Sequence, residues 1–323
     1  MKYFIKTYGC QMNKNDSEVL AGILETHGYT RTENAEDADI ILVNTCTVRE
    51  HAENKAYGFI SSLKRLKTKD QRLKIGICGC IAQQEQFNLF SKFPFVDFVI
   101  GPNNIHELPE ILTNGKLQLA VEETCNPDLR ELPVKREIST QAWISIIYGC
   151  NNFCSFCIVP YVRGREVSRP KENIIREIKE LDKSIFKEVV LLGQNVNSFG
   201  KGTDYGLANL LRDINNIKGI ERIRFLTSHP RDMSDEIINV VAELPKVCEY
   251  FHLPLQSGDD EMLKLMNRGY ASDYYRRLVD KIRKKIPDAA ITSDVVVGFP
   301  GESDEQFENT LKMIEEIKFD LVN

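Results

Sequence analysis

The chain has 323 residues and a formal net charge of −5 at pH 7, with 42% hydrophobic and 28% charged residues. This length predicts about two domains, each able to bury its own core. No apolar run is long enough to span a bilayer and no basic-then-apolar leader opens the chain, so we expect a cytoplasmic protein with no membrane partner. The acidic balance excludes a broadly basic nucleic-acid-coating protein, and any RNA contact must be local.

Apolar, β-rich runs alternate with amphipathic segments from the start of the chain, which favours an α/β fold with parallel sheets flanked by helices. In the first third, the predicted strands cover residues 3–8, 40–43, 73–77 and 96–100, and the predicted helices cover 17–26 and 48–67. Asp16 is the predicted N-cap of the first helix. We expect a flavodoxin-like parallel-sheet domain over residues 1–117.

Turn signals such as Asn114-Gly115, Asn126-Pro127 and Pro133 predict a linker over residues 118–140. The alternation then resumes, and six predicted strands cover residues 143–147, 189–192, 223–226, 250–253, 291–297 and 319–322. Six right-handed β/α units predict a partial (β/α)6 barrel of the TIM type over residues 141–323. In such barrels the reacting groups lie on loops after the carboxyl ends of the strands.

Three cysteines fall within eight residues, at Cys150, Cys154 and Cys157, directly after the first predicted barrel strand. Three thiolates on so short a loop can bind three irons of a 4Fe-4S cluster and leave the fourth iron open. Zinc is the alternative, although a C-x2-C zinc half-site normally returns as a second pair, and none with that spacing follows. An odd total of nine cysteines argues against a disulfide framework.

The spacing C-x3-C-x2-C resembles the signature of radical S-adenosylmethionine (SAM) enzymes, and Phe156 resembles its aromatic residue. The resemblance implies that SAM completes the open iron. Polar residues at the later strand ends, which could bind SAM or substrate or merely stabilise loops, are Gln194, Asn195, Ser228, His229, Gln256, Ser257 and Asp294. Three arginines after the cysteine loop could hold a carboxylate or a phosphate: Arg163, Arg165 and Arg169. We assign Arg163, Arg165 and His229 to the substrate and Phe156, Arg169, Gln194, Asn195, Ser228, Gln256 and Asp294 to SAM.

Cys10, Cys46 and Cys80 each follow a different predicted strand of the first domain. Because parallel strands point their carboxyl ends the same way, these three thiols should converge on one edge, where they could hold a second cluster. The alternative is that each is a small buried hydrophobe, as free cysteines commonly are. Cys78 is a competing thiol two residues before Cys80, and we expect Cys125 and Cys248 to be structural.

The motifs together resemble the radical SAM methylthiotransferase family over essentially the whole chain. The matching segments are YGCQMN (8–13), NTCTVRE (44–50), GCIA (79–82), YGCNNFCSFC (148–157), PYVRGRE (160–166), SRP (168–170), LGQNVN (192–197), HLPLQSG (252–258) and GFPGE (298–302). Residues 11–13 and 48–50 resemble the branch that acts on isopentenylated adenosine in tRNA. Branches acting on a ribosomal protein or on threonylcarbamoyl-adenosine tRNA are the alternatives, and a zinc-stabilised, non-catalytic RNA-binding module is an alternative of another class.

The resemblance implies that a methylthio group is added to C2 of N6-isopentenyladenosine at tRNA position 37, with two SAM molecules consumed. One SAM would methylate sulfur on an auxiliary 4Fe-4S cluster at Cys10, Cys46 and Cys80. The other would be cleaved at the 4Fe-4S cluster of Cys150, Cys154 and Cys157, and no catalytic side chain is implied beyond these ligands. An aromatic C–H has no useful acidity near neutral pH, so radical chemistry suits this reaction better than a side-chain base.

The implied partners are tRNA, an electron donor such as flavodoxin or ferredoxin, and a donor of sulfur or clusters, with the chain acting as a monomer. Members of the family continue past the last predicted strand and carry a small β-rich RNA-binding TRAM domain. We therefore expect that the barrel is incomplete at residue 323 and that the TRAM domain is absent from this sequence.

Overall fold

The computed structural model describes residues 1–47, 50–114, 118–122, 124–126, 131–137 and 139–323. Val48 and Arg49 of one family motif, and Gly115 and Pro127 of the predicted turns, lie outside the described residues. The chain divides into two compact units. The first contains Met1–Ile138, Tyr148–Cys150 and Ile158–Val167, and the second contains Ser139–Ile147, Asn151–Cys157 and Ser168–Asn323.

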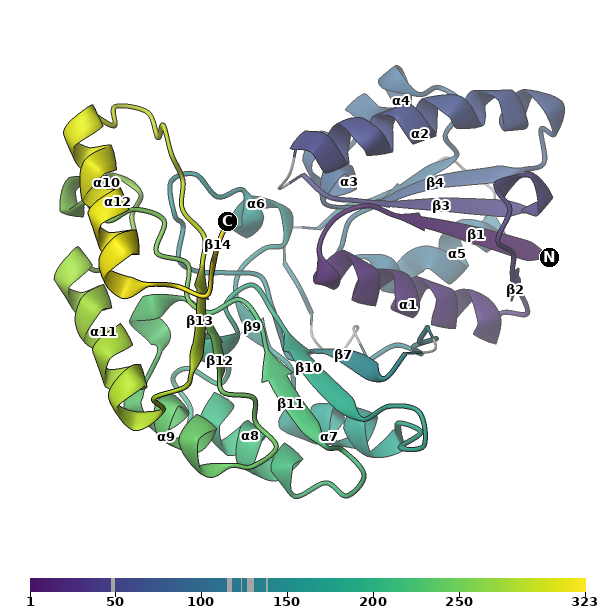
Figure 1. The fold of residues 1–323 in the computed structure, drawn as a ribbon. Coiled ribbons are helices and arrows are strands. Elements are labelled where there is room, and N and C mark those ends of the chain that lie inside the picture. Colours follow the sequence, from purple (N-terminus) through teal and green to yellow (C-terminus); the bar gives the residue numbers. More distant parts are fainter. Residues whose placement is uncertain (48–49, 115–117, 123, 127–130, 138) are drawn as a thin grey trace. The chain divides into compact units, whose positions relative to one another are not determined.

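A six-stranded parallel sheet with the order β2-β1-β3-β4-β5-β6 organises the first unit (Figure 1). Its strands are β1 (Lys2–Thr7), β2 (Thr30–Arg31), β3 (Ile40–Thr45), β4 (Lys74–Gly79), β5 (Phe98–Ile100) and β6 (Gln118–Ala120). Its helices are α1 (Gln11–Thr26), η1 (Ala35–Asp37), α2 (Glu50–Lys69), α3 (Cys80–Glu85), α4 (Asn88–Lys92), η2 (Ile105–Glu107) and α5 (Leu108–Asn114). The order is that of flavodoxin-like folds with one strand added, as predicted.

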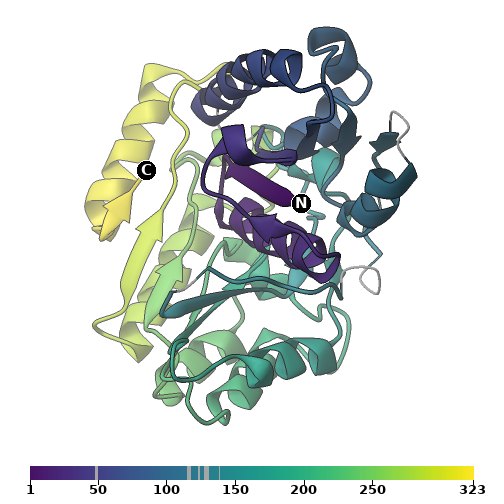
Figure 2. The same ribbon diagram turned by 90° about the vertical axis from the view of Figure 1, so that its right-hand side faces the viewer.

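Helices cover both faces of this sheet. Ile40 and Leu42 of β3 pack on one face with residues of α1 and α5, whereas Ile41 and Val43 pack on the other with residues of α2 and α3. Figure 2 shows α1 (purple) and α2 (dark blue) on opposite sides of β1. Burial on both faces explains why β3 reads as a continuous apolar run rather than an alternating one.

Two predictions for this unit are wrong. Asp16 does not cap α1, because the helix begins at Gln11 with Cys10 at the N-cap, and Asp16 is buried within the helix. Residues Gln118–Ala120, predicted as linker, form β6 and pair with β5 at the edge of the sheet. Short edge strands such as β2 and β6 carry too few residues for their periodicity to be recognised.

Two three-stranded parallel sheets follow each other along the second unit, with the orders β11-β10-β7 and β12-β13-β14. Their strands are β7 (Gln141–Ser145), β10 (Glu188–Leu192), β11 (Arg222–Phe225), β12 (Tyr250–His252), β13 (Ala290–Ser293) and β14 (Leu321–Val322), and β8 (Ile147–Tyr148) pairs with β9 (Val167–Ser168). A parallel bridge between Ile223 and Val247 connects the end of the first sheet to the segment that leads into β12. This is the predicted partial barrel.

Helices follow the strands of this unit in alternation and lie on their outer side (Figure 1). They are α6 (Val159–Val162), α7 (Lys171–Glu180), η4 (Val196–Ser198), α8 (Leu207–Asn215), η5 (Pro230–Asp232), α9 (Asp235–Glu243), α10 (Asp260–Leu265), α11 (Ser272–Lys285) and α12 (Asp304–Ile317), of which α6 falls in the first compact unit. Within the described residues, no helix is both long and apolar enough to cross a membrane.

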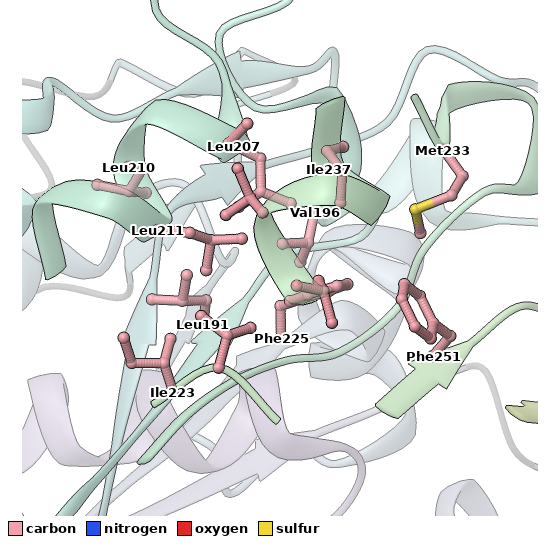
Figure 3. Packing of buried hydrophobic residues seen from close by; sticks show 14 of the residues in the cluster. Leu191, Val196, Leu207, Leu210, Leu211, Ile223, Phe225, Met233, Ile237 and Phe251 are labelled. Carbon is pink, nitrogen blue, oxygen red and sulfur yellow. The ribbon is translucent and has the colours of Figure 1, made fainter. Parts of the chain in front are cut away.

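The core of the second unit lies between its strands and helices (Figure 3). Leu191 of β10, Ile223 of β11 and Leu211 of α8 meet there, all without exposed surface. The rings of Phe225 and Phe251 pack edge to face, with centroids 6.3 Å apart. This packing fixes the strands whose carboxyl ends carry the polar residues considered below.

Truncation of Leu191 tests how much this core contributes. Leu191→Ala should lower the free energy of unfolding by about 2–5 kcal/mol, because the removed methyl groups leave a cavity in a fully buried site. The measurement is chemical denaturation, with the matched Leu311→Ala as control, since Leu311 on α12 is 36% exposed. Equal losses in the two variants would contradict the buried role of Leu191.

Candidate functional site

Three cysteines lie at the carboxyl edge of the first unit's sheet. Cys10 follows β1 and precedes α1, Cys46 directly follows β3, and Cys80 directly follows β4 as the first residue of α3. The strands β1, β3 and β4 are consecutive neighbours in one parallel sheet (Figure 1), so their carboxyl ends share an edge. The expected convergence of these three strand ends is therefore present.

Two glycines permit the close approach of these loops. Gly9 has a φ of +128°, and a Cβ there would lie 2.5 Å from the Cβ of Cys46. Gly79 has a φ of +91°, and a Cβ there would lie 2.5 Å from the carbonyl oxygen of Thr45. A side chain at either position would both strain the backbone and push the cysteine loops apart.

Electrostatics distinguish Cys10 from Cys78. A hydrogen bond from Cys46 lowers the pKa of Cys10 to about 5 against the opposing effect of burial, and the Arg163 guanidinium lowers it further. Burial raises the pKa of Cys78 to about 12. Cys78 also packs in the apolar core beside α1. The thiolate, which is the form that ligates metals, is therefore favoured at Cys10 and disfavoured at Cys78.

Arg163 lies in the first unit and is buried beside Cys10 and Cys80. Its Nη2 donates to Oδ2 of Asp16 at 3.0 Å, and both side chains are at most 5% exposed. Burial raises the pKa of Cys80, and the nearby Arg163 guanidinium opposes that rise. Asp16, predicted as a cap, is thus the carboxylate partner of an arginine that was predicted to contact substrate.

Two buried asparagines connect the cysteine loops, and the sequence interpretation missed their role. Asn13 donates to the carbonyl of Thr45 at 2.9 Å, and Asn44 donates to the carbonyl of Asn13 at 2.7 Å. Sγ of Cys10 lies 3.4 Å from Oδ1 of Asn13. Each asparagine lies two or three residues from a cysteine in the sequence. This proximity is the signal that could have identified their role.

The three thiols of this edge are chemically suited to iron in a cluster. Among the described residues, no three His, Cys, Asp or Glu side chains are grouped so that they could hold one metal ion. Structural zinc requires about four ligands around one metal. A 4Fe-4S cube instead binds each thiolate through a different iron, and three soft sulfur ligands on adjacent strand ends suit that arrangement.

The second group of cysteines lies on the loop after β7 and β8. The N–H of Cys150 donates to the carbonyl of Gly164 at 3.1 Å, and the N–H of Cys157 donates to the carbonyl of Cys154 at 2.9 Å. Gly149 has a φ of +66°, and a Cβ there would lie 2.1 Å from the carbonyl oxygen of Arg165. Cys154 accepts a hydrogen bond at Sγ from Nη1 of Arg268 at 3.3 Å.

His229 and Ser228 follow β11 as buried polar residues with unsatisfied atoms. His229 Nδ1 accepts from the N–H of Arg231 at 3.3 Å, which leaves the proton of the neutral ring on Nε2. Neither Nε2 of His229 nor Oγ of Ser228 has a hydrogen-bond partner among the described residues. The preceding Thr227 has a φ of +67°, which is an outlier for a β-branched residue and typical of strain held at a binding site.

Burial keeps His229 neutral. Desolvation, followed by the charge of Arg268, lowers the pKa of His229 to about 3. The Nε2–H is therefore a hydrogen-bond donor throughout the physiological pH range, and a buried donor without a partner is costly unless a ligand accepts from it.

The remaining predicted residues differ in whether their side chains already make hydrogen bonds within the chain. Arg169 is buried and donates from Nη1 to the Ser145 carbonyl and to Glu177, both at 2.7 Å. Asn195 donates to Asp232 at 2.7 Å, and Asp294 contacts His252 Nε2 at 3.2 Å. Gln194, Gln256 and Ser257 follow their strands as predicted, Phe156 is 40% exposed, and Arg165 is exposed.

Comparison with known families gives two matches along the chain. Residues 2–101 match the family described as "Uncharacterized protein family UPF0004". Residues 144–314 match the Radical SAM superfamily, and this range contains the cysteine loop and the barrel strands β10, β11, β12 and β13.

Two solved structures share the fold. A radical S-adenosylmethionine methyltransferase, TsrM, from Kitasatospora setae, solved with cobalamin and a 4Fe-4S cluster bound, matches with a TM-score of 0.73 at 15% identity, over 99% of this chain and 74% of that one. The cobalamin-dependent S-adenosylmethionine radical enzyme OxsB matches with a TM-score of 0.70 at 13% identity, over 97% and 52%. At such identities the likeness concerns the fold alone.

Curated relatives are much more similar in sequence. The tRNA-2-methylthio-N(6)-dimethylallyladenosine synthase of Dictyoglomus thermophilum is 55% identical over 327 residues, which cover 100% of this chain and 74% of the relative. The synthase of the same name from Thermoanaerobacter pseudethanolicus is 50% identical, over 98% and 69%. The chain therefore belongs to the tRNA-2-methylthio-N(6)-dimethylallyladenosine synthase family, within the radical SAM superfamily.

Proposed function

We propose that this chain holds two 4Fe-4S clusters and SAM, and adds a methylthio group to C2 of N6-isopentenyladenosine at position 37 of tRNA. The observation that carries the proposal is the presence of two separate cysteine trios, one after the carboxyl ends of three neighbouring parallel strands and one on the loop that follows β7 and β8. In such folds the reacting groups gather at those ends.

Each trio has its own part in the proposal. Cys10, Cys46 and Cys80 would hold the auxiliary cluster at which sulfur is methylated, and Cys150, Cys154 and Cys157 would hold the cluster that binds SAM. When bound, the latter supplies the electron that cleaves SAM to a radical able to remove the C2 hydrogen of adenine. The residues of the chain would bind and orient SAM and the adenine, and would exclude water from the site.

His229 and Ser228 are the strongest candidates for contacts to SAM or to the adenine. Their buried, unpartnered Nε2–H and Oγ require an acceptor or donor that the described chain does not supply. Because its ring stays neutral, His229 would donate a hydrogen bond rather than act as an acid.

The other assignments depend on whether each side chain already has an ion-pair or hydrogen-bond partner within the chain. Gln194, Gln256 and Asp294 remain proposed SAM contacts, and Phe156 remains the aromatic residue of the cluster loop. Arg165, which is exposed, remains a candidate for a substrate phosphate. Arg163 and Arg169 already pair with Asp16 and Glu177, so we now propose that they position their loops. Asn195, which holds Asp232 and accepts from the His229 N–H, would position His229.

The reaction also needs partners. We place the reaction in the cytoplasm and expect the chain to act as a monomer. Its partners would be a low-potential electron donor, such as flavodoxin or ferredoxin, and a separate donor of sulfur or clusters. The tRNA is the substrate, and its nucleosides give the direct assay.

Replacement of Cys80 tests the auxiliary site. Cys80→Ala should reduce methylthiolation of tRNA at least about a hundredfold, because loss of a cluster ligand exceeds the effect of losing a supporting residue. SAM cleavage to 5'-deoxyadenosine should persist, since the other trio is intact. Both products are measured by mass spectrometry of nucleosides after anaerobic reconstitution.

Cys78→Ala is the matched control, because Cys78 lies on the same strand two residues away and packs in the core. It should retain sulfur transfer. If Cys78→Ala lost sulfur transfer and Cys80→Ala retained it, the cluster ligand would be Cys78 rather than Cys80. Methylthiolation of a ribosomal protein instead of tRNA by the wild type would favour the alternative substrate.

Replacement of His229 tests its buried neutral state through pH. Between pH 6.5 and about 3 the unfolded chain binds a proton at His229 that the folded chain does not, so stability falls as the pH falls. In the middle of this window each pH unit should cost the wild type about 1.4 kcal/mol from this group, and the unit from pH 6.5 to 5.5, where the unfolded imidazole is only partly protonated, should cost about 1 kcal/mol. His229→Gln should therefore lose less stability than the wild type between pH 6.5 and 5.5.

Denaturation of the wild type and of His229→Gln at several pH values gives the measurement. An unchanged pH dependence in His229→Gln would show that His229 is not held neutral in the folded chain.

A further inference from the structure

Arg268 is a buried arginine that follows α10 and reaches the cysteine loop from 114 positions further along the chain. Its side chain makes three directed contacts. Nη1 donates to Sγ of Cys154 at 3.3 Å, Nη2 donates to the carbonyl of Pro254 at 2.7 Å, and Nε donates to the hydroxyl of Tyr270 at 3.2 Å. The guanidinium is therefore held rigidly, with one nitrogen directed at sulfur.

Among the described residues, no carboxylate forms an ion pair with Arg268. Its hydrogen bonds go to two oxygens without formal charge and to the sulfur of Cys154, and its guanidinium lies over the Tyr270 ring, 5.4 Å from the centroid. An arginine side chain keeps its proton throughout the physiological pH range, so this group stays charged. Since a buried charge without a counter-charge is strongly destabilising, the negative charge of a thiolate-ligated cluster at Cys154 would balance it.

The turn that carries Arg268 also holds the loop on both sides of Cys154. The N–H of Ser155 donates to the carbonyl of Met266 at 3.1 Å, and its hydroxyl donates to the carbonyl of Leu265 at 2.8 Å. Asn267 Nδ2 donates to the carbonyl of Phe153 at 2.9 Å. The loop therefore cannot shift away from Arg268 without breaking several hydrogen bonds.

We propose that Arg268 is a positioning residue that fixes Cys154 and raises the reduction potential of the cluster at Cys150, Cys154 and Cys157. This rests on the proposed function. One electron from a low-potential donor enters the cluster on reduction, with no bond broken in that step, and adds one negative charge. A buried cation and an N–H···S hydrogen bond both stabilise the more negative, reduced form.

The test uses the reconstituted full chain and the variants Arg268→Gln and Arg268→Lys. Arg268→Gln removes the charge and keeps an amide donor, whereas Arg268→Lys keeps the charge and loses the planar fork. The midpoint potential is read from the electron paramagnetic resonance signal that changes when SAM is added. It should be most negative in Arg268→Gln, intermediate in Arg268→Lys and highest in the wild type.

With a fixed weak reductant, SAM cleavage by Arg268→Gln should fall about tenfold, and excess dithionite should restore much of it, because the defect lies in electron entry. Arg231→Met is the matched control, since Arg231 donates to the Asn152 side chain of the same loop at 2.6 Å but makes no hydrogen bond to a sulfur atom of the described residues. Its potential should equal that of the wild type.

A wild-type potential in Arg268→Gln, at full iron content, would overturn the proposal. If that variant fails to retain the cluster, the comparison of Arg268→Lys with the wild type decides, and equal potentials would overturn it. A wild type without any SAM-sensitive signal would instead refute the proposed function.

Discussion

Parallel strands that end at a common edge are the constraint on which the first cysteine group and the polar residues of the second unit depend. In the first unit, three adjacent strands bring Cys10, Cys46 and Cys80 to one edge although they are distant in sequence. In the second unit, the polar residues after β10, β11, β12 and β13 gather for the same reason. The buried cores of the two units hold these strands in register. Side-chain packing far from the cysteines therefore determines where their thiols lie.

Buried guanidinium groups are the second shared feature. Arg163 lies beside Cys80 and Cys10, where its charge is balanced by Asp16, whereas Arg268 contacts Cys154 and has no carboxylate partner among the described residues. Thiolate ligands concentrate negative charge in a poorly solvated place, and a fixed cation offsets that charge without the reorganisation that water would need. The same Arg268 helps to keep His229 neutral. The charge of Arg268 therefore acts both on Cys154 in the cysteine loop and on the protonation state of His229.

The sequence predicted strand ends well and side-chain partners poorly. Continuous apolar runs such as 40–43 identify buried parallel strands, and a cysteine immediately after such a run can be placed at the edge without coordinates. Asp16 shows the limit, because an acidic residue near a helix start has the same local pattern whether it caps the helix or pairs with a distant arginine. Arg268 and Cys154 are 114 positions apart, and no local pattern connects them. The two-residue strand β2 and the three-residue strand β6 depend on pairing with neighbours rather than on their own periodicity.

Two independent cysteine trios are the central claim, and iron content combined with Mössbauer spectroscopy tests it most directly. Anaerobically reconstituted wild type should carry about eight irons per chain. Replacement of Cys10, Cys46 and Cys80 by alanine, or of Cys150, Cys154 and Cys157 by alanine, should each leave about four irons in a single cubane. A wild type limited to about four irons, or a triple variant that still carries about eight, would contradict the assignment of the two sites.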